Sequence, residues 1–258
     1  MPKSDSLANQ SSDKLLALME FLAMQDSPLR LSDIAAAMEM NASTVSRFLT
    51  SLINRGYAKQ EPETGRYQLT YKICEIAYNL SSKIDLSNIL YPVLREIAKA
   101  SGCRANLITR YSNSCIYLKV VAPADQILLP LQRIGKIAPL YCTGAGKLLL
   151  QEFSEKQFQE YISQEEFIRY TSHTIMNPEL LRDAVEKGRI NGYAIDDEEC
   201  ELGVRCLAFP VYDYTQHIVA VISISGSVSK LTDLYIAEYR ARLKPLVAKA
   251  SDLLGYHK

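Results

Sequence analysis

A run of small hydroxyl side chains with one arginine among them lies near the N-terminus of this 258-residue chain. At helical spacing these side chains share one face, which consists of Ser43, Thr44, Ser46, Arg47, Thr50 and Ser51. Hydroxyls and an arginine at the start of a helix suit the phosphate oxygens and base edges of a DNA major groove. Residues 40 to 60 also hold no carboxylate that would repel phosphates. A merely solvated helix face has the same composition, so this segment alone leaves both interpretations open.

A second segment could bind a ligand through its backbone N–H groups rather than through side chains. Residues 143 to 147 have the sequence Thr-Gly-Ala-Gly-Lys and are expected to begin a helix. They do not form a P-loop, because that motif requires Gly and Ser or Thr where this chain has Tyr141 and Leu148. Free N–H groups at a positive helix end favour a ligand carboxylate. The glycines can instead serve a tight turn and close packing, and the sequence does not decide between the two.

Other chemistries are disfavoured by spacing. The cysteines form no Cys-x-x-Cys pair and are interpreted as reduced thiols; they are Cys74, Cys103, Cys115, Cys142, Cys200 and Cys206. The three histidines lie far apart, and the chain has no Gly-x-Ser-x-Gly elbow. We therefore predict no metal, no cofactor and no enzymatic activity. A redox sensor acting through the thiols remains an alternative, although no resolving pair is evident.

Three short helices are expected to position the hydroxyl face. Apolar residues recur at i, i+3, i+4 and i+7 from Leu15 and again from Leu31. Asn41 is a good N-cap for a third helix, which Gly56 would end. Three helices of this length make a small bundle.

A β-hairpin is predicted directly after these helices. Strand-like runs at 57–60 and 66–69 are joined by a loop that contains Pro and Gly. Helix, helix, helix, hairpin is the order of a winged helix-turn-helix. Arg66 and Tyr67 would then lie at the wing, where a side chain can reach phosphates or the minor groove.

The rest of the chain predicts an α+β domain with a mainly antiparallel sheet. After a helix at 70–82 that we interpret as the linker, β-rich runs at 105–111, 115–121, 207–212 and 218–225 alternate with helical segments at 144–152, 154–163, 178–191 and 232–254. The expected domains are a flexible N-terminus at 1–11, a winged helix at 12–70, a linker helix at 71–85, and a large α+β domain at 86–258, to which the family resemblance described below assigns effector binding and oligomerisation.

The net charge of the chain indicates whether nucleic acid is an expected partner. The chain has 29 Lys and Arg against 29 Asp and Glu, so no basic excess signals nucleic acid. Residues 1–70 are also nearly balanced, with seven basic and eight acidic side chains. If this part binds DNA, we expect few phosphate contacts per subunit and affinity gathered by oligomerisation. Apolar runs are far shorter than the roughly 20 residues of a membrane span, which predicts a cytoplasmic protein without a membrane partner.

Several motifs together resemble the IclR family of bacterial transcriptional regulators. They are the third helix (41–49), the wing (56–67), Gly-Tyr-Ala-Ile-Asp-Asp-Glu-Glu (192–199), Leu-Gly-Val-Arg-Cys-Leu-Ala-Phe-Pro-Val (202–211) and Ala-Val-Ile-Ser-Ile-Ser-Gly (220–226). The resemblance implies a palindromic operator, a GAF-like C-terminal domain that binds a small effector, and homodimers that assemble into a tetramer. Ala42 and Ser46 depart from residues common in the family, so the operator sequence does not carry over.

The resemblance also implies an effector pocket, formed by Gly144, Ala145, Asp196, Cys206, Ser223 and Ser225. Ser223 and Ser225 alternate along a strand and so offer two hydroxyls on one side. Asp196 would repel a carboxylate and is expected to accept hydrogen bonds from ligand hydroxyls. Cys206 is expected to line the pocket rather than react. These residues predict a hydroxylated or keto acid as the effector. A likeness of residues 132–135 and 139–141 to sugar-acid regulators of the family implies that this acid comes from carbohydrate catabolism, and we expect the regulator that it controls to be a repressor.

Overall fold

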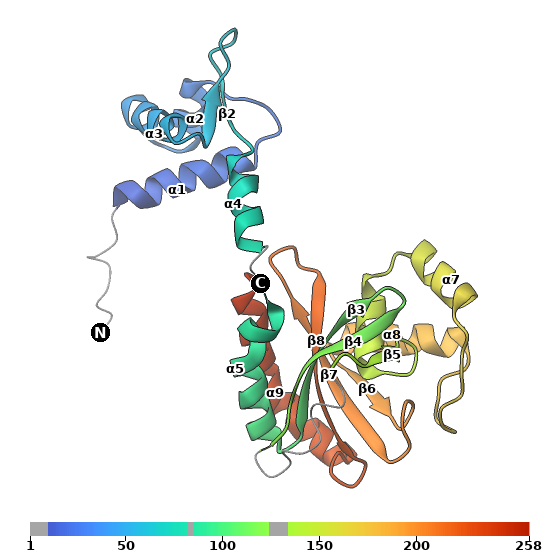
Figure 1. The fold of residues 1–258 in the computed structure, drawn as a ribbon. Coiled ribbons are helices and arrows are strands. Elements are labelled where there is room, and N and C mark those ends of the chain that lie inside the picture. The colour runs from blue at the N-terminus through green and yellow to red at the C-terminus, as the bar shows by residue number, and fades with distance from the viewer. Residues whose placement is uncertain (1–9, 82–84, 124–133, 258) are drawn as a thin grey trace. The chain divides into compact units, whose positions relative to one another are not determined.

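The computed structural model describes residues 10–81, 85–123 and 134–257. The chain divides into two compact units, Met1–Ile84 and Asp85–Lys258 (Figure 1). Most of the predicted flexible segment 1–11 lies outside the described residues. Its last two residues are helical, because the first helix already begins at Gln10.

The first unit is a winged helix-turn-helix, as predicted. Its described elements are the helices α1 (Gln10–Ala23), α2 (Leu31–Ala37), α3 (Ala42–Asn54) and α4 (Lys72–Ser81) and the antiparallel strands β1 (Ala58–Gln60) and β2 (Tyr67–Leu69). The apolar stripes of the first three helices meet in one core, in which Leu18, Ile34 and Leu49 are almost completely buried. Each such side chain contributes about 1.5–3 kcal/mol, so this core fixes the direction in which the polar face of α3 points.

Two local features of the first unit differ from expectation. Asn41 occupies the N-cap position of α3, but its side chain makes no capping hydrogen bond. The wing also gains a third backbone segment, because Leu29 and Tyr67 exchange N–H···O bonds of 3.0 and 2.7 Å. The hairpin is therefore tied to the turn before α2. The linker region contains α4, and residues 82–84 lie outside the described part.

The second unit is an α+β domain built on a six-stranded antiparallel sheet. The strand order is β5-β4-β3-β8-β7-β6. The strands are β3 (Arg104–Tyr111), β4 (Ser114–Val121), β5 (Ile137–Pro139), β6 (Ala194–Asp197), β7 (Val204–Tyr212) and β8 (Ile218–Ser227). The sequence did not predict the short edge strands β5 and β6.

Helices cover both faces of this sheet (Figure 1). They are α5 (Leu86–Ser101), α6 (Gly144–Leu149), which continues into the 3-10 turn η2 (Leu150–Glu152), α7 (Glu155–Gln164), α8 (Pro178–Asn191) and α9 (Asp233–Leu253). Because side chains alternate along a strand, each face has its own apolar core. One core includes Leu107 and Ile222 under α5 and α9, and the other includes Val221 and Ala208 beside α6. No described helix is long and apolar enough to cross a membrane.

Candidate functional sites

The predicted DNA-binding face of α3 is open to solvent at its centre. Ser43, Arg47 and Thr50 are exposed, whereas Thr44 and Ser46 are half-buried. The Arg47 guanidinium makes no ion pair or hydrogen bond with any described residue. The hydroxyl of Thr50 donates to the Ser46 carbonyl at 2.9 Å, which leaves its lone pairs free to accept. The face therefore presents one unpaired cation and several hydroxyls.

Asn41 lies at the N-terminal end of this face, although sequence analysis assigned it only a capping role. Its side chain is exposed and makes no capping bond, so both its amide donors and its carbonyl are available at the N-terminus of α3. Asn and Gln amides are suited to adenine edges in the major groove. The feature that identifies Asn41 as a candidate DNA contact is an N-cap side chain without a capping hydrogen bond. This feature is visible only in the structure.

The two predicted wing residues differ. The Arg66 side chain is half-buried and is not ion-paired among the described residues. The Tyr67 ring, in contrast, packs against the hydrophobic core of the first unit. The loop is held by bonds from Gln60 Nε2 to the Gly65 carbonyl and from the Thr64 hydroxyl to Glu61, at 2.9 and 2.7 Å. Arg66 is thus the better placed of the two for a DNA contact.

Four of the six predicted effector residues share one face of the large sheet. Asp196 lies directly opposite Cys206, and Cys206 lies opposite Ser225. Ser223 is two residues from Ser225 on β8 and so faces the same way. This face is the one covered by α6. The antiparallel register therefore brings together polar side chains that the sequence placed in three separate segments.

A buried asparagine that sequence analysis missed connects these groups. Asn106 on β3 is only 1% exposed, and its Nδ2 donates to the hydroxyls of Ser223 and Ser225, at 3.2 Å in both cases. Its Oδ1 is buried without a partner in the described structure. An unsatisfied buried carbonyl is costly and indicates a ligand or water donor at this place. In the sequence, Asn106 is a polar amide within the apolar run of β3, and this pattern could have identified it as a candidate site residue.

The glycine segment before α6 serves packing as well as ligand access. A Cβ on Gly146 would lie 2.2 Å from the Leu140 carbonyl oxygen, so the backbones of these two residues approach too closely for any side chain. Gly144 approaches β6 instead, with its hypothetical Cβ 3.2 Å from the Asp196 nitrogen. The methyl group of Ala145 is buried in the core beneath α6. The close-packing interpretation is therefore correct for Gly146.

Lys147 of the same segment forms a buried ion pair and does not face a ligand. Its ammonium binds Glu199 and donates to the Ile195 carbonyl at 2.8 Å. Asp196, 4% exposed, accepts from the Glu199 nitrogen at 2.9 Å. Burial raises the pKa of Asp196 to about 7, and the Glu199 carboxylate adds to the rise. Asp196 can therefore gain or lose a proton near neutral pH, which the sequence did not indicate.

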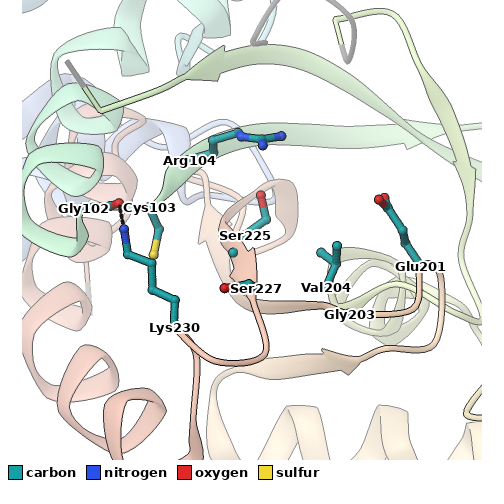
Figure 2. A pocket seen from close by; sticks show the side chains of 10 residues that line it. Gly102, Cys103, Arg104, Glu201, Gly203, Val204, Ser225, Ser227 and Lys230 are labelled. Carbon is teal, nitrogen blue, oxygen red and sulfur yellow. Dashed lines mark hydrogen bonds between the residues drawn. The ribbon is translucent and has the colours of Figure 1, made fainter. Parts of the chain in front are cut away.

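An open pocket of about 350 Å³ adjoins the end of this polar face (Figure 2). Of the predicted effector residues it contains only Ser225, and its wall includes Arg104, Glu201 and Lys230. The Lys230 ammonium donates to the Gly102 carbonyl. Gly144 and Ala145 line no part of this pocket.

A winged helix joined to a domain with a polar sheet face is the arrangement expected of a DNA-binding transcriptional regulator. Residues 11–62 match the IclR helix-turn-helix domain, and residues 79–252 match the bacterial transcriptional regulator IclR C-terminal domain. The chain belongs to the IclR family of bacterial transcriptional regulators. Its matched families and relatives are regulators rather than enzymes, which confirms the expectation drawn from the absence of catalytic motifs.

The relatives align over almost the whole chain. The HTH-type transcriptional regulator XynR of Escherichia coli is 28% identical over 96% of this chain and 98% of its own. KdgR of Dickeya chrysanthemi is 31% identical over 95% of this chain and 79% of its own. The solved Thermotoga maritima IclR, 30% identical, has a TM-score of 0.62 and covers 95% of this chain and 99% of its own. The Agrobacterium tumefaciens repressor BlcR, 20% identical over 95% of this chain and 97% of its own, supports the fold alone, with a TM-score of 0.74.

Proposed function

We propose that this regulator is a repressor that binds a palindromic operator in the cytoplasm through α3 and the wing. The observation that carries this proposal is the face of α3, on which the unpaired Arg47 stands among hydroxyls with no carboxylate between residues 40 and 60. The proposed contacts are Ser43, Thr44, Ser46, Arg47, Thr50 and Arg66, with Tyr67 supporting the wing from the core. A relative from Escherichia coli is the transcriptional repressor IclR, 29% identical over 90% of this chain and 85% of its own.

The near neutrality of residues 1–70 supports binding as an oligomer. With few basic side chains, one subunit neutralises few phosphates, and counterion release then gives little affinity. Two subunits on the two half-sites of a palindrome multiply that affinity through effective concentration. We therefore propose a homodimer as the operator-binding unit and a tetramer as the full assembly.

The ligand that we propose is a hydroxylated or keto acid. Asp196, Cys206, Ser223 and Ser225 supply the polar face of its site, and Gly144 and Ala145 supply backbone groups beside Asp196. The unpartnered Oδ1 of Asn106 calls for a ligand donor such as a hydroxyl, since a carboxylate cannot donate. A hydroxylated acid supplies both donors and acceptors, whereas a keto acid supplies acceptors only and leaves this Oδ1 to a water molecule.

Two linked measurements test this function. A thermal-shift screen of sugar acids and keto acids on the purified chain should find a compound that raises the melting temperature, because a ligand selective for the folded state stabilises it. A gel shift on the chain's own upstream region should show binding that this compound changes. Absence of any shift, with or without the acids, would contradict the proposed DNA binding. Binding of aromatic or purely apolar compounds alone would contradict the proposed ligand class.

A pair of thiols favours thiol redox control as a second candidate function. Cys142 and Cys200 are distant in sequence, but Cys142 is completely buried in one apolar core of the second unit and Cys200 packs against that same core. Interaction with Cys142 lowers the pKa of Cys200, whereas interaction with Cys200 and burial raise the pKa of Cys142. In this candidate function Cys200 acts as the nucleophile and Cys142 as the resolving thiol, a pairing that the sequence did not indicate.

Hydrogen peroxide as the oxidant would convert this pair to a disulfide in two steps. The Cys200 sulfur attacks the peroxide and becomes a sulfenic acid with release of one water. Cys142 then attacks that sulfur, a second water leaves, and a disulfide forms. The nitrogen of Cys200 donates to Asp196 at 3.4 Å, so a disulfide here would act on the candidate effector site.

Peptide mapping and operator titration after peroxide treatment test the second candidate. Wild type should yield a Cys142–Cys200 linked peptide and an altered operator affinity, and Cys200→Ser should show neither. Cys103→Ser is the matched control, because Cys103 is buried and burial raises its pKa. If peroxide changes the operator affinity of wild type and Cys200→Ser equally, the pair does not control the protein.

A further inference from the structure

Arg104 is a cation without a partner on the candidate effector face. It is the first residue of β3, it is half-buried, and it lies directly opposite Ser225 on β8. Its guanidinium makes no ion pair or hydrogen bond with any residue that the structure describes. Arginine presents a planar set of five donors that matches a carboxylate, so a half-buried and unpaired one is suited to bind an anion.

Arg104 also completes a row across four neighbouring strands. The row runs from Asp196 on β6 through Cys206 and Ser225 to Arg104 on β3, each opposite the next. Strands are about 4.8 Å apart, so the two ends of the row are about 14 Å apart at their Cα atoms. Figure 2 shows the side chains of Arg104, Ser225 and Glu201 extending to the same side of the strands. The row thus has an acid at one end, a cation at the other, and neutral polar groups between.

Charge decides which end of the row suits a carboxylate. The backbone N–H groups of Gly144 and Ala145 lie beside Asp196, and Glu199 is close to Asp196. A carboxylate placed there would meet the Asp196 and Glu199 carboxylates in a buried environment, where repulsion is strong, and the nearby Lys147 ammonium is already bound to Glu199. At the other end is the Arg104 guanidinium; the wall of the same pocket also contains Lys230, whose ammonium is bound to the Gly102 carbonyl, and the acidic Glu201. The positive end is therefore the Arg104 end.

We propose that Arg104 binds the carboxylate of the effector and thereby makes the protein selective for acids. The ligand lies along the row, with its acid group between Arg104 and Ser225 and its hydroxyls toward Asn106 and Asp196. This inference rests on the proposed effector function and replaces the α6 N-terminus by Arg104 as the anion-binding element. It accounts for both the unpaired guanidinium and the unpartnered Asn106 carbonyl.

Calorimetric titration with matched charged and uncharged ligands tests Arg104. The probes are D-gluconate, D-galactonate and pyruvate, with D-glucitol and D-galactitol as uncharged analogues. Wild type should bind at least one acid more tightly than its alditol. Arg104→Gln should lower that acid's affinity by roughly 10-fold or more, as expected for charge-assisted hydrogen bonds, and should not change alditol binding. Arg110→Gln is the matched control, because Arg110 lies on the same strand and is exposed.

The outcomes separate this inference from the proposed function. The Arg104 side chain makes no ion pair or hydrogen bond with a described residue, so Arg104→Gln should unfold at the wild-type urea concentration without ligand, which excludes a structural cause. Equal acid affinity in wild type and Arg104→Gln would overturn the role of Arg104 and leave the acid-controlled regulator intact. Failure of wild type to bind any of the three acids would overturn both the acid class and Arg104, while operator binding by the same sample would leave the DNA-binding function standing.

Discussion

The two proposed functional faces of this protein, one for DNA and one for an effector, are built in opposite ways. The DNA-binding face comes mainly from one helix, α3, and its side chains are exposed or half-buried and are near neighbours in sequence. The effector face comes from four strands and the segment before α6, and its central groups are buried and hydrogen-bonded to one another. A local, solvated face tolerates single substitutions with little cost in stability. A buried face assembled from distant segments links ligand binding to folding.

The largest effect that distinguishes the two faces is expected at Gly146. Gly146→Ala places a methyl group against the Leu140 backbone, which has no flexible end that can move away. We expect a loss of more than about 3 kcal/mol in the free energy of unfolding, at the upper end for overpacking. Gly188→Ala is the control, since its nearest neighbour is the mobile end of Gln151. Urea denaturation showing equal stability for both variants would mean that the glycine segment is not a packing element.

Asp196 should make the stability of the effector face depend on pH. Its pKa is raised to about 7 in the folded protein from an ordinary value of 3.8, so its protonated form favours folding at low pH. This stabilisation is full below pH 3.8 and is lost as pH rises through 7. Wild type should therefore lose about 2–3 kcal/mol between pH 5 and pH 8 relative to Asp196→Asn, at about 1.4 kcal/mol per pKa unit. Parallel pH profiles of the two proteins in urea denaturation would contradict this.

A substitution on the DNA-binding face should act on binding alone. Arg47→Ala removes the unpaired cation of α3, and we expect operator affinity to fall by about 1–3 kcal/mol while the melting temperature stays constant. Arg169→Ala is the matched control, because it removes an exposed arginine from the second unit. The measurement is fluorescence anisotropy on labelled operator at physiological salt. An unchanged affinity in Arg47→Ala would place the recognition surface elsewhere.

The smallest effect is expected at the wing. Arg66→Ala should weaken operator binding only a few-fold, equally for specific and unrelated DNA, because a phosphate contact carries no sequence information. The slope of log affinity against log salt should fall by about 1 for each contact removed. A loss confined to the specific operator would show that Arg66 reads bases instead.

How much of each face could be predicted from the sequence depends on whether its residues are neighbours in the chain or come from distant segments. The helices of the first unit could be predicted because apolar spacing within about ten residues fixes which side faces the core, as at Leu18 and Leu49. The strands β3, β4, β7 and β8 were found for the same local reason. Asn106, Arg104 and the Cys142–Cys200 contact could not be found, because strand register and loop packing decide which distant residues meet. The non-capping side chain of Asn41 likewise depends on local geometry that composition does not record.

The central claim is that the two faces are separate but coupled, and one anisotropy titration tests it most directly. Labelled upstream DNA is titrated with wild type, Arg47→Ala and Asp196→Asn, each with and without the acid that best stabilises wild type. We expect the acid to change the operator affinity of wild type, Asp196→Asn to bind DNA normally but not respond to the acid, and Arg47→Ala to bind DNA weakly while still binding the acid. A full response to the acid in Asp196→Asn would contradict the account.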